Sequence, residues 1–201
     1  MKVTGKKADG SEIRDLESWF LNGGPAGNAT QWKDYRSAKE LAQAWCRFGV
    51  VRCPDELSIL FGQSDELPGW ELQQVVAEML LRFDDNPKGN RHADLAGWGT
   101  YGPTRKKEAF AFTVEAKADE EFDLPVGRWK ETRLKKSPSS GAPERLQKLA
   151  QGLFGRAPNQ QIESLPYQLL PALAGTAALA KEKSANRAVL VIHEFISLTL
   201  N

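Results

Sequence analysis

An acid and a base stand side by side near the end of an otherwise apolar stretch, residues 109–118. The side chains of this stretch alternate in character, which predicts a β-strand. In such a strand Glu115 and Lys117 lie on one face, whereas Phe110 and Phe112 lie on the other. An ion in an apolar strand is costly unless it is paired or binds a metal. The stretch therefore predicts either a buried salt bridge or a functional site.

A second acid, Asp94, precedes this pair in the sequence. Asp94 lies 21 residues before Glu115 (115 − 94), within residues 91–98, which predict another short strand. The turn-rich residues 99–107 allow the two strands to be antiparallel neighbours. Asp94 and Glu115 can then meet, with Lys117 beside them. Two carboxylates on adjacent strands suit Mg²⁺, which takes one or two carboxylates and keeps several waters.

An Asp followed at a distance by Glu-x-Lys resembles the motif of the PD-(D/E)XK nuclease superfamily, and Asp94, Glu115 and Lys117 carry that resemblance. Ala93 stands where a proline often precedes the acid. The resemblance implies a hydrolase that cleaves phosphodiesters with Mg²⁺ (or Mn²⁺), with DNA as the expected substrate. Asp94, Glu115 and the backbone carbonyl of Ala116 would bind the metal. Lys117 would position the attacking water or the phosphate.

Three longer blocks support the same placement. Residues 36–45, 92–95 and 114–122 resemble the blocks of an uncharacterised bacterial domain family that we place in this superfamily. The resemblance implies an α/β fold with a restriction-endonuclease-like core, a mixed sheet of four or more strands flanked by helices. We expect this core to span residues 67–201, with residues 1–66 as an N-terminal helical extension packed on it.

The superfamily core needs a helix, two strands, a third strand, a helix and a strand in that order, and the hydrophobic pattern predicts most of these elements. The last of them is a strongly apolar strand, which should lie at or next to the centre of the sheet. Helices are predicted over residues 11–21, 37–48, 54–61, 69–83, 144–154 and 164–183, and strands over residues 91–98, 109–118 and 187–195.

The predicted helices add weaker candidates for the site. In the superfamily a helix before the first strand often supplies a further Glu, which makes Glu78 the first choice and Glu71 the second. Some members carry a Gln or Lys on the helix after the Glu-x-Lys strand, which points to Gln168. His92 could reach the site from the Asp94 strand. For each of these residues a purely structural role is the alternative.

A basic segment follows the Glu115 strand. Five of the nine residues 128–136 are basic, with Trp129 among them. Basic residues interleaved with an aromatic suit a nucleic-acid backbone. The alternative is a mobile, solvated loop. The candidate contacts to nucleic acid are Arg128, Lys130, Arg133, Lys135 and Lys136.

Composition sets the limits of these hypotheses. The chain of 201 residues is 41% hydrophobic and 26% charged with a net charge of +1, so any nucleic-acid surface has to be local. The two cysteines, Cys46 and Cys53, form no disulfide framework or metal-ligand spacing, which favours a reducing compartment. No signal peptide or membrane-spanning stretch is visible, so we expect a cytoplasmic protein without a membrane partner. A homodimer or a partner protein stays open.

One rival hypothesis comes from a different class of protein. The chain could be a catalytically inactive binding or scaffold protein that keeps the same fold. Glu115 and Lys117 would then be only an ion pair at the edge of the sheet. The position of the Asp94 carboxylate relative to Glu115 distinguishes the two hypotheses.

Overall fold

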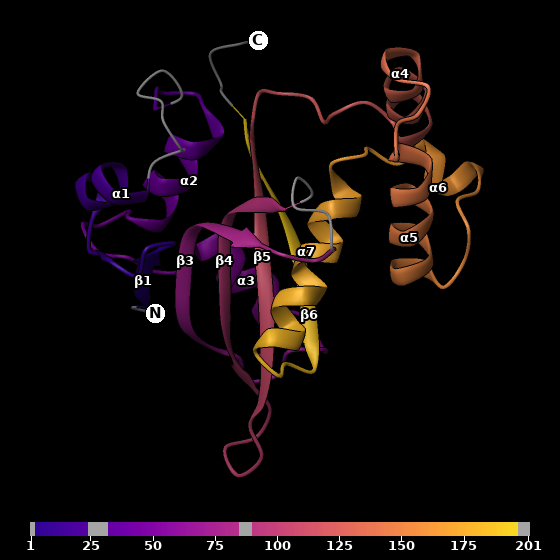
Figure 1. The fold of residues 1–201 in the computed structure, drawn as a ribbon. Helices are drawn as coiled ribbons and strands as arrows, with labels where there is room; N and C mark the ends of the chain where they lie inside the picture. The colour runs from indigo at the N-terminus through magenta and orange to yellow at the C-terminus, as the bar shows by residue number, and fades with distance from the viewer. Residues whose placement is uncertain (1–2, 24–31, 85–89, 197–201) are drawn as a thin grey trace.

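The computed structural model describes residues 3–23, 32–84 and 90–196, which form a mixed sheet covered by helices (Figure 1). The strands lie in the order β2-β1-β3-β4-β5-β6. Along the chain the elements are β1 (Thr4–Lys7), β2 (Glu12–Ile13), α1 (Leu16–Gly23), α2 (Ser37–Trp45), α3 (Asp55–Gly62), β3 (Glu71–Leu81), β4 (Arg91–Tyr101), β5 (Glu108–Ala118), α4 (Val126–Lys136), α5 (Ala142–Phe154), α6 (Gln160–Ser164), α7 (Leu169–Glu182) and β6 (Arg187–Phe195).

The centre of the sheet combines two kinds of strand pairing. β3, β4 and β5 form an antiparallel meander, whereas β6 runs parallel to β5 and β1 runs parallel to β3. A parallel pair needs a crossover connection. The crossover from β5 to β6 ends with helix α7. The expected α/β class, with a mixed sheet flanked by helices, is confirmed. β6 itself is the edge strand and is not central.

The main hydrophobic core lies between the sheet and helices α2 and α3. Phe110 and Phe112 of β5 are fully buried there. The ring of Phe61 from α3 meets both edge-on, with centroid distances of 6.0 and 5.4 Å. On the opposite face α7 packs closely, because Gly175 has no side chain to collide with Leu81. β5 is therefore covered on both sides, which fixes the strand that carries Glu115 and Lys117.

The prediction of a helix over residues 69–83 is wrong. The segment forms β3, which pairs with β1 on one side and β4 on the other. Val75, Val76 and Ala77 are consecutive and all buried, because both faces of the strand are covered at this point. A strand buried on both faces loses the alternation that would identify it. A register shift between Leu72 and Gln74 disturbs the pattern further.

Three smaller corrections concern other elements. Residues 1–66 were expected to be helical but also supply β1 and β2, which extend the sheet beyond β3. Residues 128–136 lie in the helix α4 and not in a loop. The helix expected over residues 164–183 begins at Leu169, so Pro171 falls in its first turn, where proline is tolerated.

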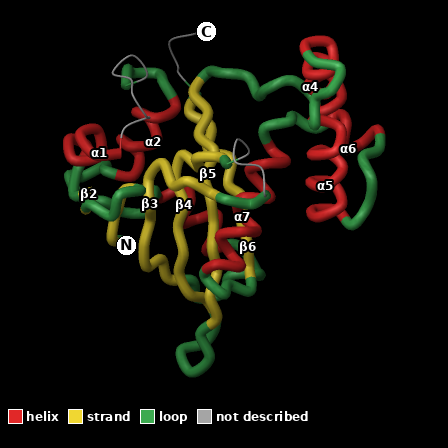
Figure 2. Tube along the Cα trace, viewed as in Figure 1, coloured by secondary structure: helices red, strands yellow, loops and turns green. Residues whose placement is uncertain are grey.

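Helices α4, α5 and α6 are inserted between β5 and α7 and share a second hydrophobic core. Figures 1 and 2 show them as a group beyond α7, away from α1 and α2. Trp129, Leu146 and Ile162 come from the three helices and are buried together with Leu170 of α7. Within the described residues, no helix combines the length and the apolar character that crossing a membrane requires.

Candidate functional site

Asp94 and Glu115 lie on adjacent antiparallel strands, one residue beyond the pair formed by Leu95 and Val114. The Asp94 carboxylate accepts a hydrogen bond from the backbone N–H of Ala116, with an oxygen–nitrogen distance of 2.7 Å. This contact brings the acid of β4 directly onto the Glu-x-Lys segment of β5. The positions of these residues follow from the short connection between β4 and β5, which keeps the two strands in register.

Glu115 is buried and is surrounded by three side chains. Arg91 from the start of β4 forms a salt bridge with Oε2, and the side-chain amide of Gln168 donates to Oε1. The ammonium of Lys117 lies 3.7 Å from Oε1. Lys117 is itself buried and lies 4.0 Å from Glu120. The structure thus brings two predicted residues, Lys117 and Gln168, into contact with Glu115.

Arg91 belongs to this cluster although no sequence pattern singled it out. It precedes Asp94 by three residues (94 − 91), a spacing that places the two on opposite faces of a regular strand. Its guanidinium also approaches the backbone oxygen of Gln168, at 3.4 Å. Both contacts join segments far apart in the chain, so only the folded arrangement of β4, β5 and the start of α7 reveals them.

The Asp94 carboxyl experiences opposing electrostatic effects. Desolvation is the strongest and raises its pKa, because burial disfavours the charged form. The hydrogen bond from Ala116 and the positive charges of Arg91 and Lys117 act in the opposite direction, but the net shift is upward. An additional cation close to Asp94 would favour the ionised form and lower this pKa.

Glu78 contributes a third carboxyl group, from a strand and not from the predicted helix. The register places it across from Asp94, between the pairs Ala77–Leu95 and Met79–Ala93. Desolvation, with a smaller contribution from the negative charge of Asp94, raises the pKa of Glu78 to about 7. Its backbone has a φ of 52°, an uncommon conformation for a residue other than glycine.

The remaining weak candidates have other partners. His92 is exposed, and its Nδ1 atom lies 3.0 Å from the backbone oxygen of Glu78, as in the structural alternative. Glu71 lies at the far end of β3, seven residues from Glu78 and therefore roughly 23 Å along the strand. It forms an ion pair with Lys107 at 3.2 Å. Glu71 is therefore not part of the cluster around Glu115.

The donor set fits a hard divalent cation. Asp94, Glu115 and the nearby peptide carbonyl of Ala116 offer oxygen atoms, which Mg²⁺ prefers, and water can complete its shell. Across residues 3–23, 32–84 and 90–196, no group of three or more His, Cys, Asp or Glu side chains is arranged to bind a metal ion. A metal site here would therefore depend on two carboxylates and a carbonyl, with Glu78 across from Asp94 on the neighbouring strand.

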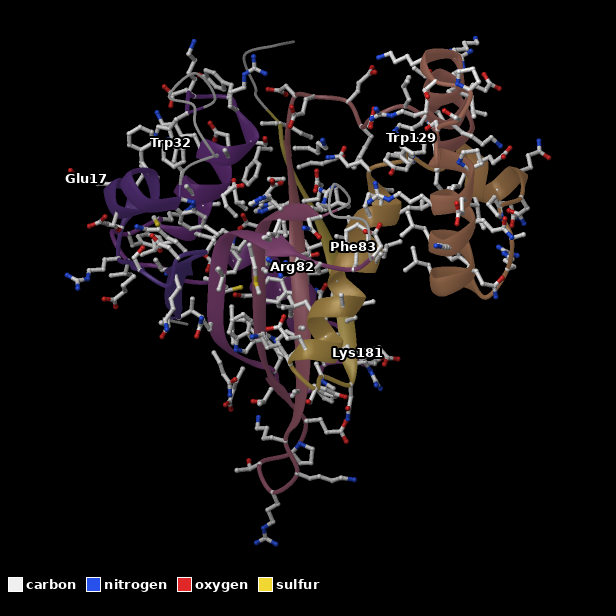
Figure 3. The ribbon with its side chains drawn as sticks, in the orientation of Figure 1. Glu17, Trp32, Arg82, Phe83, Trp129 and Lys181 are labelled. Atoms are coloured by element: carbon white, nitrogen blue, oxygen red, sulfur yellow. The ribbon has the colours of Figure 1, made fainter. Side chains whose placement is uncertain are left out.

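The predicted basic segment is a helix with a buried aromatic residue. Trp129 stacks on Tyr167 with a centroid distance of 3.6 Å, so it offers no free surface to a base. Figure 3 shows Trp129 on the side of α4 toward the rest of the protein. Lys130 forms an ion pair with Glu163. The exposed basic residues of the segment are Arg128, Arg133, Lys135 and Lys136.

A groove of about 850 Å³ lies away from the carboxylates, between α5, α7 and the end of β3. Figure 3 labels Arg82, Phe83 and Lys181, which line it. Its lining combines alanine and leucine side chains from the two helices with charged side chains. None of the site residues on β4 and β5 lines the groove, so the groove is not part of the candidate site.

Comparison with known protein families places the whole site within one domain. The model of the family described as "Domain of unknown function (DUF6946)" matches residues 12–201. The chain belongs to this family. Comparisons with curated proteins and with solved structures found no match. The DUF6946 description carries no activity, so the function has to be argued from the cluster around Glu115.

Proposed function

We propose that this DUF6946 protein is a nuclease of the PD-(D/E)XK superfamily that uses Mg²⁺ (or Mn²⁺) to hydrolyse phosphodiesters in nucleic acid, with DNA as the expected substrate. One observation carries the proposal. The Asp94 carboxylate accepts a hydrogen bond from the backbone N–H of Ala116, the residue between Glu115 and Lys117. Two acids and a lysine from the predicted motif are therefore neighbours at one end of the sheet.

The order of the elements supports the same proposal. The superfamily core needs a helix, three strands, a helix and a strand. The chain has α3, β3, β4, β5, α7 and β6 in that order, with α4 to α6 inserted before α7. Asp94 then belongs to the second strand of the core and the Glu-x-Lys segment to the third.

The residues of the cluster would have separate tasks. Asp94, Glu115 and the Ala116 carbonyl would hold the cation. A bound Mg²⁺ would supply a Lewis acid that lowers the pKa of water and offsets charge on the phosphate. Lys117 would donate a hydrogen bond from Nζ to the attacking water or to a phosphate oxygen. Gln168 would hold the Glu115 carboxylate in a fixed orientation, because its amide donates to Oε1.

A second candidate function is a binding or scaffold protein without catalysis. The observation that favours it is the closed network around Glu115, in which Arg91, Gln168 and Lys117 already engage both carboxylate oxygens. Such a network satisfies a buried charge without any metal. In this case the protein would bind its partner with the same affinity in the presence and in the absence of divalent cations.

A cleavage assay separates these functions. Single- and double-stranded DNA and RNA are incubated with the protein, with and without Mg²⁺ or Mn²⁺. We expect metal-dependent cleavage, which Lys117→Ala reduces by about 10²-fold or more, as for loss of a group that stabilises developing charge. Lys117→Ala should still bind metal, because Lys117 is not a ligand.

Thermal unfolding supplies the metal readout independently of cleavage. A cation that binds only the native state raises the melting temperature. We expect Mn²⁺ to stabilise the wild type, and Asp94→Ala to abolish this stabilisation. Arg14→Ala, which removes an exposed partner of Glu12, is the control and should respond as the wild type does. Equal metal affinity in Asp94→Ala and wild type would refute the site. Bound metal without cleavage of any nucleic acid would favour the binding protein.

A further inference from the structure

Arg91 occupies the place on Glu115 that a divalent cation would need. Its Nη2 atom is paired with Oε2, whereas Gln168 and Lys117 lie on Oε1. A cation can coordinate Oε2 directly only after the guanidinium has moved away. The Arg91 side chain is 17% exposed, so this positive charge is largely enclosed by the protein.

The competition should be energetically significant. Removing one partner of a buried ion pair is strongly destabilising, because the other charge stays buried without compensation. In the folded protein without metal, Arg91 provides that compensation for Glu115. A cation has to offset the loss of this pair before it gains from coordination. In a protein without the Arg91 charge, a cation could bind Glu115 without first breaking this ion pair.

A displaced guanidinium also needs a new acceptor. Arginine carries five N–H donors in a planar fork that matches the oxygens of a phosphate, and leaving buried donors unpaired is costly. Arg91 begins β4, next to the end of β5 and the start of α7. A phosphodiester brought to the carboxylates would place its oxygens near this side chain.

We propose that Arg91 is the resident counter-ion of the carboxylate site, which competes with a divalent cation for Glu115 and, once displaced, pairs with a substrate phosphate. This inference rests on the proposed function. It assigns a role to a residue outside the Asp-Glu-Lys motif. It also explains how the site can be closed by its own side chains and still accept a metal.

The first test measures Mn²⁺ affinity by titration calorimetry for the wild type, Arg91→Gln and Arg91→Lys. Arg91→Gln keeps a hydrogen-bond donor for Glu115 but removes the charge, so we expect binding at least about tenfold tighter, or ~1.4 kcal/mol. Arg91→Lys should also bind more tightly than the wild type, because an ammonium cannot bridge Glu115 and Gln168 as a fork does. Arg52→Gln, which removes the partner of Asp55, is the matched control and should leave the affinity unchanged.

The sign of this change makes the test specific. Damage to the fold would weaken metal binding, whereas loss of a competing cation strengthens it. Circular dichroism checks that each variant is folded, and if Arg91→Gln does not fold, Arg91→Lys decides. Equal or weaker binding in a folded Arg91 variant, with a wild type that binds Mn²⁺, would overturn the competition alone. No Mn²⁺ binding by any of the proteins would overturn the metal site of the proposed function as well.

The second test concerns the phosphate. Affinity for a short DNA duplex is measured by fluorescence anisotropy at saturating Mn²⁺, in a Lys117→Ala background in which cleavage is expected to be slow. Adding Arg91→Gln should weaken duplex binding at least about tenfold, since a charge-assisted contact is lost. Adding Arg52→Gln should not. An unchanged duplex affinity in the Arg91 variant would overturn the pairing with phosphate.

Discussion

At the scale of single residues, the site is defined by an imbalance of charge. The carboxyl groups of Glu78, Asp94 and Glu115 gather near the end of β5, and within the described chain Arg91 and Lys117 are the cations in their cluster. Enclosed carboxyl groups in excess of cations must bind protons or a further cation. Burial is the main cause that raises the pKa of both Glu78 and Asp94, and for Glu78 the negative charge of Asp94 raises it further.

Glu78 should make the stability of the metal-free protein fall as pH rises. Burial raises its pKa from the ordinary 4.5 to about 7, so the native state binds this proton more tightly than the unfolded state. The stabilisation is therefore fully present below pH 4.5 and is lost as pH rises through about 7. At 1.36 kcal/mol per pH unit its upper limit is roughly 3 kcal/mol.

The variant Glu78→Gln removes this titration. We expect it to be more stable than the wild type at pH 8, by up to about 3 kcal/mol, and to lose the difference near pH 4.5. Urea unfolding across this range, with a chelator present, measures the effect. Glu144→Gln, which changes an exposed glutamate on α5, is the control and should follow the wild-type curve. A Glu78→Gln curve parallel to that of the wild type would contradict the assignment.

The residues of the site differ in how far the sequence could reveal them. Asp94, Glu115 and Lys117 follow from strand alternation and a short turn, both of which are local properties. Arg91 could not be found in this way, because its partners lie on β5 and before α7. The role of Trp129 was equally hidden, since stacking on Tyr167 depends on how α4 packs near the start of α7.

At the scale of elements, β3 shows why the sequence predicted the wrong structure. Periodicity identifies a strand with one buried face, whereas β3 is paired on both edges and covered on both faces at its centre. Its consecutive apolar residues then resemble a helix. Glu78 nevertheless lies beside the Asp94 strand, because β3 pairs with β4 at this point.

Close packing between β4 and β5 holds the carboxylates in register. Gly97 pairs with Phe112, and a Cβ atom at Gly97 would lie 2.4 Å from the Phe112 ring and 3.0 Å from the backbone oxygen of Gln74. Gly97→Ala should therefore destabilise the protein by about 1–3 kcal/mol through overpacking. Phe112→Leu should reduce that cost, so the double variant should be more stable than additivity predicts.

Denaturant unfolding measures the Gly97–Phe112 coupling. Gly152→Ala on α5 is the control, because a Cβ there meets no atom within 4 Å. Since alanine is the better helix former, the control should gain up to about 1 kcal/mol. Wild-type stability in Gly97→Ala would show that β4 and β5 can separate without cost, and that the register does not depend on this glycine.

At the scale of the whole molecule, the sheet and the inserted helices contribute different groups to the proposed function. The sheet places the carboxylates, and α4 carries exposed basic residues on the same chain segment that leaves β5. A net charge of +1 gives little overall attraction for a polyanion. Contacts to phosphates therefore have to come from a local surface, and α4 lies toward the end of the sheet at which β5 ends (Figure 1).

The charge of α4 can be tested against an equal charge at the opposite end of β5. Arg128 and Lys135 are exposed on α4, whereas Arg105 and Lys106 are exposed in the connection between β4 and β5. Each phosphate contact contributes about one to the slope of log K against log salt concentration. Changing Arg128 and Lys135 to alanine should weaken DNA binding at low salt and lower the slope by up to about two.

Changing Arg105 and Lys106 to alanine removes the same two charges far from the site and should leave the slope unchanged. This control separates a local surface from the effect of net charge, since both double variants have the same total charge. Metal-induced stabilisation should be equal in both, because α4 contributes no ligand. An identical salt slope in the two variants would show that α4 makes no phosphate contacts, and that the exposed basic residues of this helix serve only to keep it solvated.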